Sequence, residues 1–402
     1  MSAKIDPSAS SIQEKLLWAV DELAIELPSW AFLNTGTRFK VWQHPGTPRN
    51  VEERIDDAGT VHRYTGIART VALHIPWDKT ADYTGLLEYM NSKDLGVGGI
   101  NLNTFQDADY MLGSMCNADP AVREKALGAL RECCEIAAEM GAPAVKVWLG
   151  DGTNYPGQDD LRWRRHRLVE GLQQAYAWLP EQARMLLEYK IFEPAFYSTD
   201  VQDWGQAMAV CNKVGERAVV CVDTGHHSLG VNIEQIVALL LAEGKLGAFD
   251  LNDKKYGDDD LMVGSIDPYQ LFRITHELVN AMRDEADPVA QDTANHTTYM
   301  LDQCHNIEAK VPAVIRSVQT LQELFAKALL VDRPALLKAQ ARGDVLEANN
   351  LLWSAFFTDV RGPLAELRQE RGLPGDPFHA YLESGEEEER AASRVGGEAQ
   401  SW

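Results

Sequence analysis

The stretch ARMLLEYKIFEPAFYSTDVQDWGQAMAVCNKVGERAVVCVDTG, residues 183–225, decides the fold. It begins with an apolar run, residues 183–190, and ends with a second run that starts at Arg217. Between them, residues 203–214 place apolar side chains at the period of a helix. A strand, a helix and another strand in this order predict two parallel strands of one sheet, because parallel neighbours need a crossover connection.

The same alternation continues along most of the chain. Helical segments, such as residues 121–140, separate most of eight apolar runs that are typical of buried strands. Eight repeats predict a closed (β/α)8 TIM barrel; an open doubly wound sheet is the weaker alternative, since the sequence has no GxGxxG turn. The runs are SWAFLN near Trp30, TVALHIPW from Thr70, GGINLNTF from Gly98, PAVKVWLG from Pro143, ARMLLEYK from Ala183, RAVVCVDTG from Arg217, LGAFDLND from Leu246 and TTYMLDQ from Thr297.

Helical patterns flank the predicted barrel. An amphipathic segment, residues 12–27, follows a Ser-rich N-cap region and stops at Pro28. From about residue 311 the pattern is helical almost throughout, and the final residues are polar, charged and contain glycine. We therefore expect an N-terminal helical segment at 1–28, a catalytic barrel at 29–330, a C-terminal helical extension at 331–383 and a disordered acidic tail at 384–402.

Composition narrows the classes of partner. The 402 residues are 45% apolar, which is enough for the core of a globular enzyme. A formal net charge of −22 predicts no nucleic-acid partner and no anionic-membrane partner, because phosphates would repel the chain. The sequence has no apolar run of about 18 residues, no secretion-signal pattern at its start and no CxxC pair among six cysteines. These features predict a cytoplasmic protein that binds a small molecule.

Four consecutive predicted strands end in a carboxylate. In a TIM barrel these ends form the active-site rim, where four carboxylates would repel one another unless a cation compensated them. A single Asp at a strand end can equally form a turn or cap the next helix, but the coincidence of four favours a hard divalent ion such as Mg²⁺ or Mn²⁺. The four residues are Glu188, Asp223, Asp250 and Asp302.

The acidic loop FDLNDKKYGDDDL, residues 249–261, suggests a second ion. Asp258 and Asp260 lie two positions apart, so an extended chain would place both on one side. With His226, three residues after Asp223, they could hold a second ion, and Glu188 or another strand-end carboxylate could bridge the two. The alternatives are a solvated acidic loop and a histidine at a helix start. Two neighbouring ions would suit adjacent oxygens of a sugar.

Aromatic and polar residues near other strand ends would form the pocket. Aromatic faces suit the C–H surfaces of a sugar, and Lys190, on the strand face of Glu188, could contact a substrate oxygen. Ordinary packing of the aromatic residues and a salt bridge of Lys190 are the alternatives. The pocket residues are His74, Trp77, Phe105, Trp148 and Lys190, with Asn103 and Lys146 on the same strands.

Seven motifs, in order between about Glu26 and Asp332, resemble those of the broad-specificity bacterial L-rhamnose isomerases, relatives of xylose isomerase. The resemblance implies a (β/α)8 barrel, a homotetramer and two divalent ions per subunit, most suitably Mn²⁺, with Mg²⁺ or Co²⁺ as alternatives. It also implies interconversion of an aldose with its 2-ketose. The motifs are ELPSWAFLNTGTRF, VALHIPWD, VKVWLGDGTNYPGQ, LEYKIFEPAFY, VDTGHH, NDKKYGDDDLMVGSI and MLDQCHNIE.

The resemblance also assigns roles to residues. A base steered by Asp258 or Asp302 would remove the O2 proton, hydride would pass between C2 and C1, and Lys190 would help to stabilise the oxyanion. His74, Trp77, Phe105 and Trp148 would shape the sugar pocket. The first ion would be held by Glu188, Asp223, Asp250 and Asp302, and the second by Glu188, His226, Asp258 and Asp260.

One position departs from this family. Asp250 stands where the family has a histidine, so the site would carry about one more negative charge and favour harder ions. The set of four carboxylates predicted around the first ion resembles the set that xylose isomerases have at the corresponding ion. The rival interpretations are a sugar 3-epimerase on the same barrel, an abasic-site endonuclease, which the acidic composition disfavours, and a sugar-binding relative without catalysis.

Overall fold

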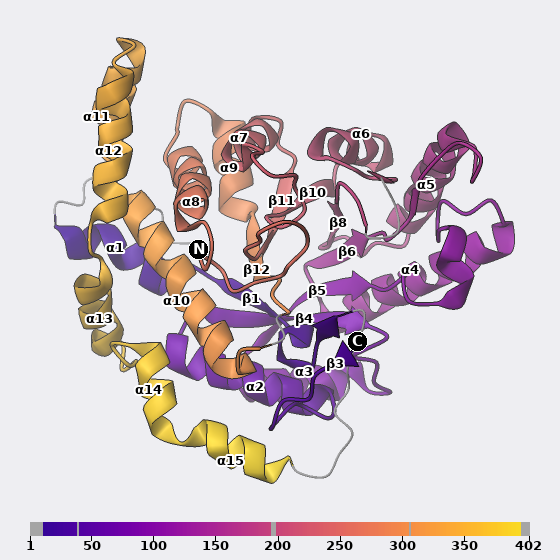
Figure 1. Cartoon of the computed structure of the whole chain (residues 1–402), viewed down its shortest axis with the longest axis horizontal. Coiled ribbons are helices and arrows are strands. Elements are labelled where there is room, and N and C mark those ends of the chain that lie inside the picture. The colour runs from indigo at the N-terminus through magenta and orange to yellow at the C-terminus, as the bar shows by residue number, and fades with distance from the viewer. Residues whose placement is uncertain (1–10, 38–39, 194–197, 305–306, 395–402) are drawn as a thin grey trace.

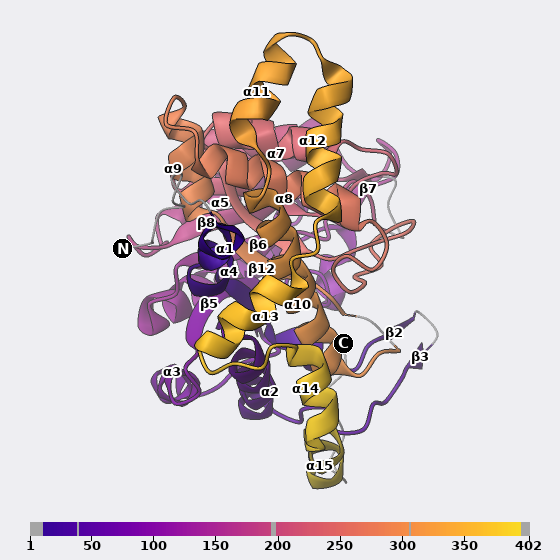
Figure 2. The same cartoon turned by 90° about the vertical axis from the view of Figure 1, so that its left-hand side faces the viewer.

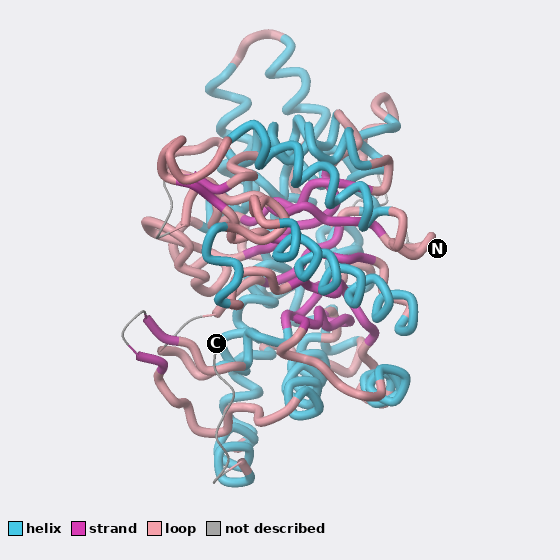
Figure 3. Tube along the Cα trace, turned by 90° about the vertical axis from the view of Figure 1, so that its right-hand side faces the viewer, coloured by secondary structure: helices cyan, strands magenta, loops and turns pink. Residues whose placement is uncertain are grey.

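The predicted barrel is present in the computed structural model, which describes residues 11–37, 40–193, 198–304 and 307–394. Eight parallel strands close in the order β1-β12-β11-β10-β8-β6-β5-β4, and helices surround them (Figure 1, Figure 3). The (β/α)8 fold class is therefore confirmed. The strands are β1 (Ile25–Pro28), β4 (Ala68–Ile75), β5 (Gly96–Leu102), β6 (Ala144–Trp148), β8 (Arg184–Glu188), β10 (Ala218–Asp223), β11 (Leu246–Leu251) and β12 (Thr298–Leu301).

Helices connect successive strands and form the outer layer. Many begin at an Asp or Asn whose side chain accepts a backbone N–H, as Asp203 does from Gln206 at 2.9 Å. Such caps and the apolar faces of the helices fix where each connection turns back to the sheet. The helices of the barrel are α2 (Val51–Thr65), α3 (Tyr83–Asn91), α4 (Pro120–Met140), α5 (Leu161–Tyr176), α6 (Trp204–Val214), α7 (Ile233–Ala242), α8 (Pro268–Met282), α9 (Pro288–His296) and α10 (Lys310–Leu329).

The barrel interior is layered, and the layers position the site. One layer is a buried apolar cluster formed by Ala144, Leu186, Val219, Cys221 and Ala248. Gly247 is required beside it, because a Cβ there would lie 2.3 Å from the side chain of Val219. Since side chains alternate along a strand, the positions two residues further toward the C-terminal end face the same way. On β6, β8, β10 and β11 those positions are Lys146, Glu188, Asp223 and Asp250.

The start of the barrel differs from the prediction. The helix expected over residues 12–27 is shorter: α1 (Ile12–Asp21) ends early, and β1 follows within the same segment. The strand expected at SWAFLN is wrong, because Ser29–Phe32 form a short 3-10 helix, η1. Strand β1 pairs with both β4 and β12, and its Ile25 and Leu27 are fully buried, so barrel closure determines this short strand.

The C-terminal part extends along one side of the barrel. Helices α11 and α12 form a hairpin that projects from the barrel, and α13 and α14 pack beside α1 and α10 respectively (Figure 1, Figure 2). The described chain has no helix that is both long and apolar enough to cross a bilayer. The helices are α11 (Arg333–Ala341), α12 (Val345–Phe357), α13 (Arg361–Glu370), α14 (Pro377–Ser384) and α15 (Glu386–Ser393).

The expectation of a disordered tail over 384–402 is wrong for its first part. Residues 386–393 form α15, and residues 395–402 lie outside the described chain. Arg63 on α2 pairs with Glu386 at 2.6 Å, and Arg394 pairs with the buried Asp57 on the same helix at 2.8 Å. These tertiary ion pairs hold the Glu-rich segment as a helix against the barrel.

Further short elements lie in loops. The 3-10 helix η2 spans Ala108–Leu112. Two small antiparallel pairs complete the described structure: β2 (Gly36–Thr37) with β3 (Lys40–Val41), and β7 (Gly152–Thr153) with β9 (Ser198–Thr199).

Candidate active site

Four carboxylates converge at the C-terminal end of the barrel. One oxygen from each of Glu188, Asp223, Asp250 and Asp302 lies within 4.8 Å of an oxygen of every other member. Strand register produces this, because Asp223 is the direct neighbour of Asp250 across β10 and β11. Asp302 follows β12, and its N–H donates to the carbonyl of Leu251 at 2.8 Å. We call these four residues the carboxylate quartet.

The pKa values within the quartet show the cost of this crowding. Burial, with the nearby charge of Asp250, raises the pKa of Glu188 to about 8. Burial likewise raises the pKa of Asp223 to about 6 and that of Asp302 well above its ordinary value. Without a bound cation, the positively charged side chains around the quartet therefore do not compensate its four carboxylates.

His226 connects the quartet to the acidic loop. Its Nδ1 lies 3.2 Å from Glu188 Oε1, and its Nε2 lies 3.1 Å from Asp258 Oδ1. Burial acts to lower the pKa of His226, but the charges of Asp223 and Asp258 outweigh it and raise that pKa. The imidazole thus lies between Glu188, which is predicted to bridge both ions, and Asp258, which is predicted to hold the second.

Lys190 anchors the acidic loop from the opposite side. Its ammonium donates to Asp258 Oδ2 at 2.7 Å and to Glu193. Burial raises the pKa of Asp258, but His226 and Lys190 reverse the effect and hold it below its ordinary value. Asp258 is therefore anionic and fixed between two nitrogen groups.

Asp260 lies in the same cavity but has different partners. Its Oδ2 accepts the thiol of Cys304 at 2.9 Å, and its Oδ1 lies 3.4 Å from Asn252 Nδ2. Burial and the neighbouring Asp258 raise the pKa of Asp260 well above its ordinary value. The structure thus brings His226 and Asp258 into contact and places Asp260 beside them; their role as ligands of a second ion stays a prediction.

A cavity of about 270 Å³ opens above the quartet, and aromatic side chains form one wall. His74 stacks on Trp77 with ring centroids 3.8 Å apart, and Phe105 meets the edge of Trp148 at 4.7 Å. Burial, helped by the charges of Lys146 and Arg54, lowers the pKa of His74 to about 3, so its ring is neutral. All four aromatic residues predicted for the pocket line this cavity.

Sequence reasoning missed four lining residues, Trp30, Asn101, Leu102 and Glu193, and two of them hydrogen-bond to predicted site residues. Trp30 donates from its indole to Asp302 Oδ1 at 2.8 Å, and Glu193 accepts from Lys190. Trp30 lies in the run that was predicted to be a strand, where an inward indole could not be distinguished from packing. Glu193 follows Lys190 by three residues in a loop, and its spacing gave no signal.

The donor atoms of the quartet fit a divalent ion. Asp250 is fully buried, and its Oδ2 accepts no hydrogen bond from any residue that the structure describes. A buried carboxylate oxygen without a donor is the environment that a bound cation would satisfy. Carboxylate oxygens, with an imidazole beside them, suit Mg²⁺ or Mn²⁺. Glu188, Asp223, Asp250 and Asp302 would hold it.

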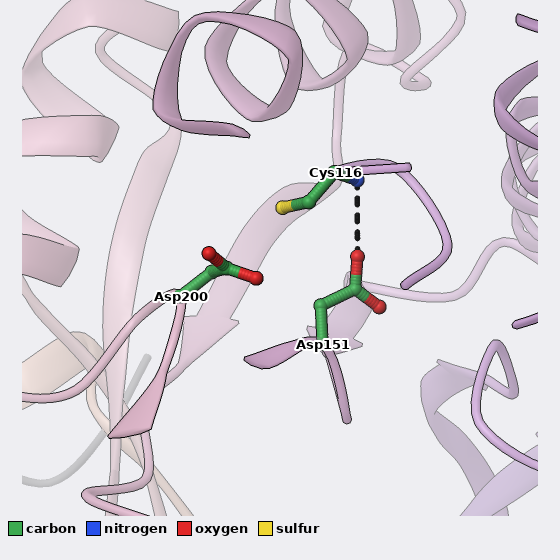
Figure 4. A group of neighbouring side chains, drawn as sticks. All are labelled: Cys116, Asp151 and Asp200. Atoms are coloured by element: carbon green, nitrogen blue, oxygen red, sulfur yellow. Dashed lines mark hydrogen bonds between the residues drawn. The ribbon is translucent and has the colours of Figure 1, made fainter. Parts of the chain in front are cut away.

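In a second acidic cluster, by contrast, protein groups satisfy the carboxylates (Figure 4). Cys116, Asp151 and Asp200 also place potential ligand atoms within 4.8 Å of one another. However, Asp151 accepts from the backbone N–H of Ser114 at 2.8 Å and from that of Cys116 at 3.0 Å. Asp200 pairs with the buried guanidinium of Arg164 at 2.6 Å. We therefore interpret this cluster as a structural polar network.

Comparison with protein families identifies the class of this barrel. Residues 64–279 match the family described as xylose isomerase-like TIM barrel, and the chain belongs to this family. It is 41% identical over 375 residues to a protein of Rhizobium meliloti (strain 1021) named probable sugar isomerase, covering 92% of this chain and 86% of that protein. A xylose isomerase of Thermus thermophilus is 28% identical over 236 residues, or 54% of this chain and 60% of that enzyme.

Solved structures share the fold at low sequence identity. A xylose isomerase domain protein from Alicyclobacillus acidocaldarius aligns with a TM-score of 0.54 at 15% identity, over 76% of this chain and 99% of that chain. An L-ribulose 3-epimerase aligns with a TM-score of 0.51 at 15% identity, over 81% of this chain and 98% of that one. At this identity the likeness concerns the fold alone.

Proposed function

We propose that this protein is a metal-dependent aldose–ketose isomerase that interconverts L-rhamnose and L-rhamnulose, and related aldoses, by a 1,2-hydride shift. The observation that carries the proposal is the carboxylate quartet, which lies beneath an aromatic cavity and lacks enough positive charge. The name of the Rhizobium relative, probable sugar isomerase, supports the same class of reaction. The rhamnose assignment rests on the motifs described above.

Two divalent ions per subunit, most suitably Mn²⁺, are part of the proposal. The quartet would hold the first, and Glu188, His226, Asp258 and Asp260 would hold the second. Such ions polarise neighbouring sugar oxygens and stabilise the negative charge that develops on them.

The remaining chemistry belongs to side chains of the cavity. The ammonium of Lys190 lies 2.7 Å from Asp258 and would present a fixed positive charge to a substrate oxygen. Asp258 or Asp302 would steer removal of the O2 proton. The stacked rings of His74 and Trp77, with Phe105 and Trp148, would contact C–H faces of the sugar and exclude water.

An aldose panel tests this function. Purified protein is assayed for ketose formation from L-rhamnose, L-mannose, L-lyxose and D-allose before chelation, after chelation and after Mn²⁺ is restored. We expect turnover that chelation abolishes and Mn²⁺ recovers. Products inverted at C3 would indicate the rival 3-epimerase, and sugar binding without turnover would indicate a non-catalytic relative.

Isotope labelling tests the route of hydrogen transfer. With deuterium at C2, a hydride shift retains the label in the ketose, whereas proton abstraction through an enediol releases it to solvent. Retention is the expected result. The homotetramer implied by the motifs is a separate part of the proposal, and light scattering of the purified protein measures it.

A further inference from the structure

Lys146 places a positive charge inside the candidate metal centre. It lies on β6, two residues before Trp148, so both side chains point into the barrel. Its ammonium donates to Asp250 Oδ1 and lies 3.7 Å from the sulfur of Met300. Both partners of this ion pair are nearly inaccessible to solvent, with side-chain exposures of 5% for Lys146 and 1% for Asp250.

The two lysines of the cavity have different partners. Lys190 directs its ammonium to Asp258 and Glu193, outside the quartet. Lys146 instead contacts a member of the quartet and occupies one oxygen of Asp250. The other oxygen, Oδ2, receives no hydrogen bond from the described chain. Asp250 therefore has one oxygen fixed by an ammonium and one available to a ligand.

The contact between Lys146 and Asp250 changes the net charge of the quartet. With all four carboxylates ionised, the quartet carries four negative charges, and the ammonium of Lys146 reduces the sum to three. A bound dication would then leave one excess negative charge rather than two. Inside a protein, one unit charge at about 4 Å changes a Coulomb energy by several kcal/mol, so the difference is large enough to alter ion affinity.

We propose that Lys146 is a positioning residue of the metal centre. Its ammonium offsets the charge of Asp250 and fixes Oδ1 of that carboxylate, and it thereby lowers the affinity of the centre for divalent ions. The inference rests on the proposed function, since it concerns the ion that the quartet would bind. A weaker hold leaves the ion a stronger Lewis acid toward the sugar, because its ligands donate less negative charge.

Mn²⁺ binding to metal-free protein tests the inference without any measurement of turnover. The dissociation constant is measured by calorimetry for wild type and for the single variants Lys146→Met, Lys146→Arg and Asp250→Asn. We expect Lys146→Met to bind Mn²⁺ about tenfold more tightly or better, because the ion meets one more uncompensated charge. Lys146→Arg should stay near wild type, and Asp250→Asn should bind more weakly.

The double variant Lys146→Met/Asp250→Asn separates charge from packing. The double variant has the same net charge at the centre as wild type, so we expect its Mn²⁺ affinity to return to within about threefold of wild type. Lys245→Met is the matched control, since this lysine donates to the carbonyl of Ala218 at the opposite end of the barrel. Its Mn²⁺ affinity should equal that of wild type.

The outcomes distinguish this inference from the proposed function. Wild type that binds no Mn²⁺ would overturn the metal centre itself. Wild type that binds Mn²⁺ while Lys146→Met binds equally or less tightly would overturn only the role of Lys146. If Lys146→Met does not fold, the double variant is compared with Asp250→Asn; tighter binding by the double variant supports the inference, and equal or weaker binding overturns it.

Discussion

Two acidic clusters of this barrel differ in how the protein compensates their carboxylates. Around Asp151 and Asp200, backbone N–H groups and the guanidinium of Arg164 satisfy the oxygens. In the quartet, burial raises the pKa of Glu188 to about 8, and one oxygen of Asp250 receives no hydrogen bond from the described residues. A shortage of positive groups, rather than the proximity of acids, distinguishes a candidate metal site from a structural network.

The largest expected effect is on turnover. Glu188→Gln removes a quartet charge and should lower kcat/KM for the best aldose by more than about a hundredfold, the upper cost of losing even an outer-shell partner of a metal. Glu216→Gln, an exposed residue before β10, is the matched control and should keep full activity. Equal activity of the two variants would show that the quartet has no catalytic role.

Removal of the metal should change the thermal stability of the protein through the quartet and not through the cluster around Asp151 and Asp200. Mn²⁺ at about one hundred times its dissociation constant stabilises the protein that binds it by about 2.7 kcal/mol, so chelation should lower the Tm of wild type. The same Mn²⁺-dependent increase in Tm should persist in Asp151→Asn and disappear in Glu188→Gln. An increase that disappears in Asp151→Asn would reverse the assignment of the two clusters.

Asp151→Asn should be a stability variant. One oxygen of Asp151 accepts from the backbone N–H groups of Ser114 and Cys116, and the other accepts from the Ser114 hydroxyl. A neutral amide replaces these charge-assisted hydrogen bonds with weaker ones and forces the buried hydroxyl to reorient, at a cost of about 1–3 kcal/mol in the free energy of unfolding. Denaturant unfolding measures this loss, and kcat of the folded fraction should not change. A stable variant with reduced kcat would instead indicate a part in catalysis.

The smallest expected effect is at Cys116. Because Asp151 accepts from the backbone N–H of Cys116, Cys116→Ala preserves that hydrogen bond and should cost no more than about 1 kcal/mol of stability. Mn²⁺ affinity, measured in the same preparation, should equal that of wild type. A weakened Mn²⁺ affinity would indicate that the thiol is a metal ligand, and the two clusters would then no longer differ in metal binding.

The strand-end carboxylates could be predicted because the barrel fold brings such positions to one rim. Glu188, Asp223 and Asp250 each end or nearly end an apolar run, and that local pattern survives in the structure. Strand β1 could not be predicted in the same way, since its four residues follow α1 closely and gain their pairing only when the barrel closes.

Contacts between distant segments explain the other differences. Lys146 meets Asp250 across 104 positions of sequence, and no periodicity connects a lysine of one strand with a carboxylate of another. Similarly, the Glu-rich tail resembles a disordered segment until Arg63 and Glu386, 323 residues apart, are brought together. In both cases, a charged partner that is distant in sequence and close only in the folded chain determines the local structure.

Anomalous diffraction from crystals soaked in MnCl₂ tests the central claim most directly. We predict a manganese peak within about 2.0–2.6 Å of oxygens from Glu188, Asp223, Asp250 and Asp302, the range for hard cations with oxygen ligands. A peak beside Asp151 and Asp200, or an empty quartet in crystals where Mn²⁺ binds elsewhere, would contradict the account.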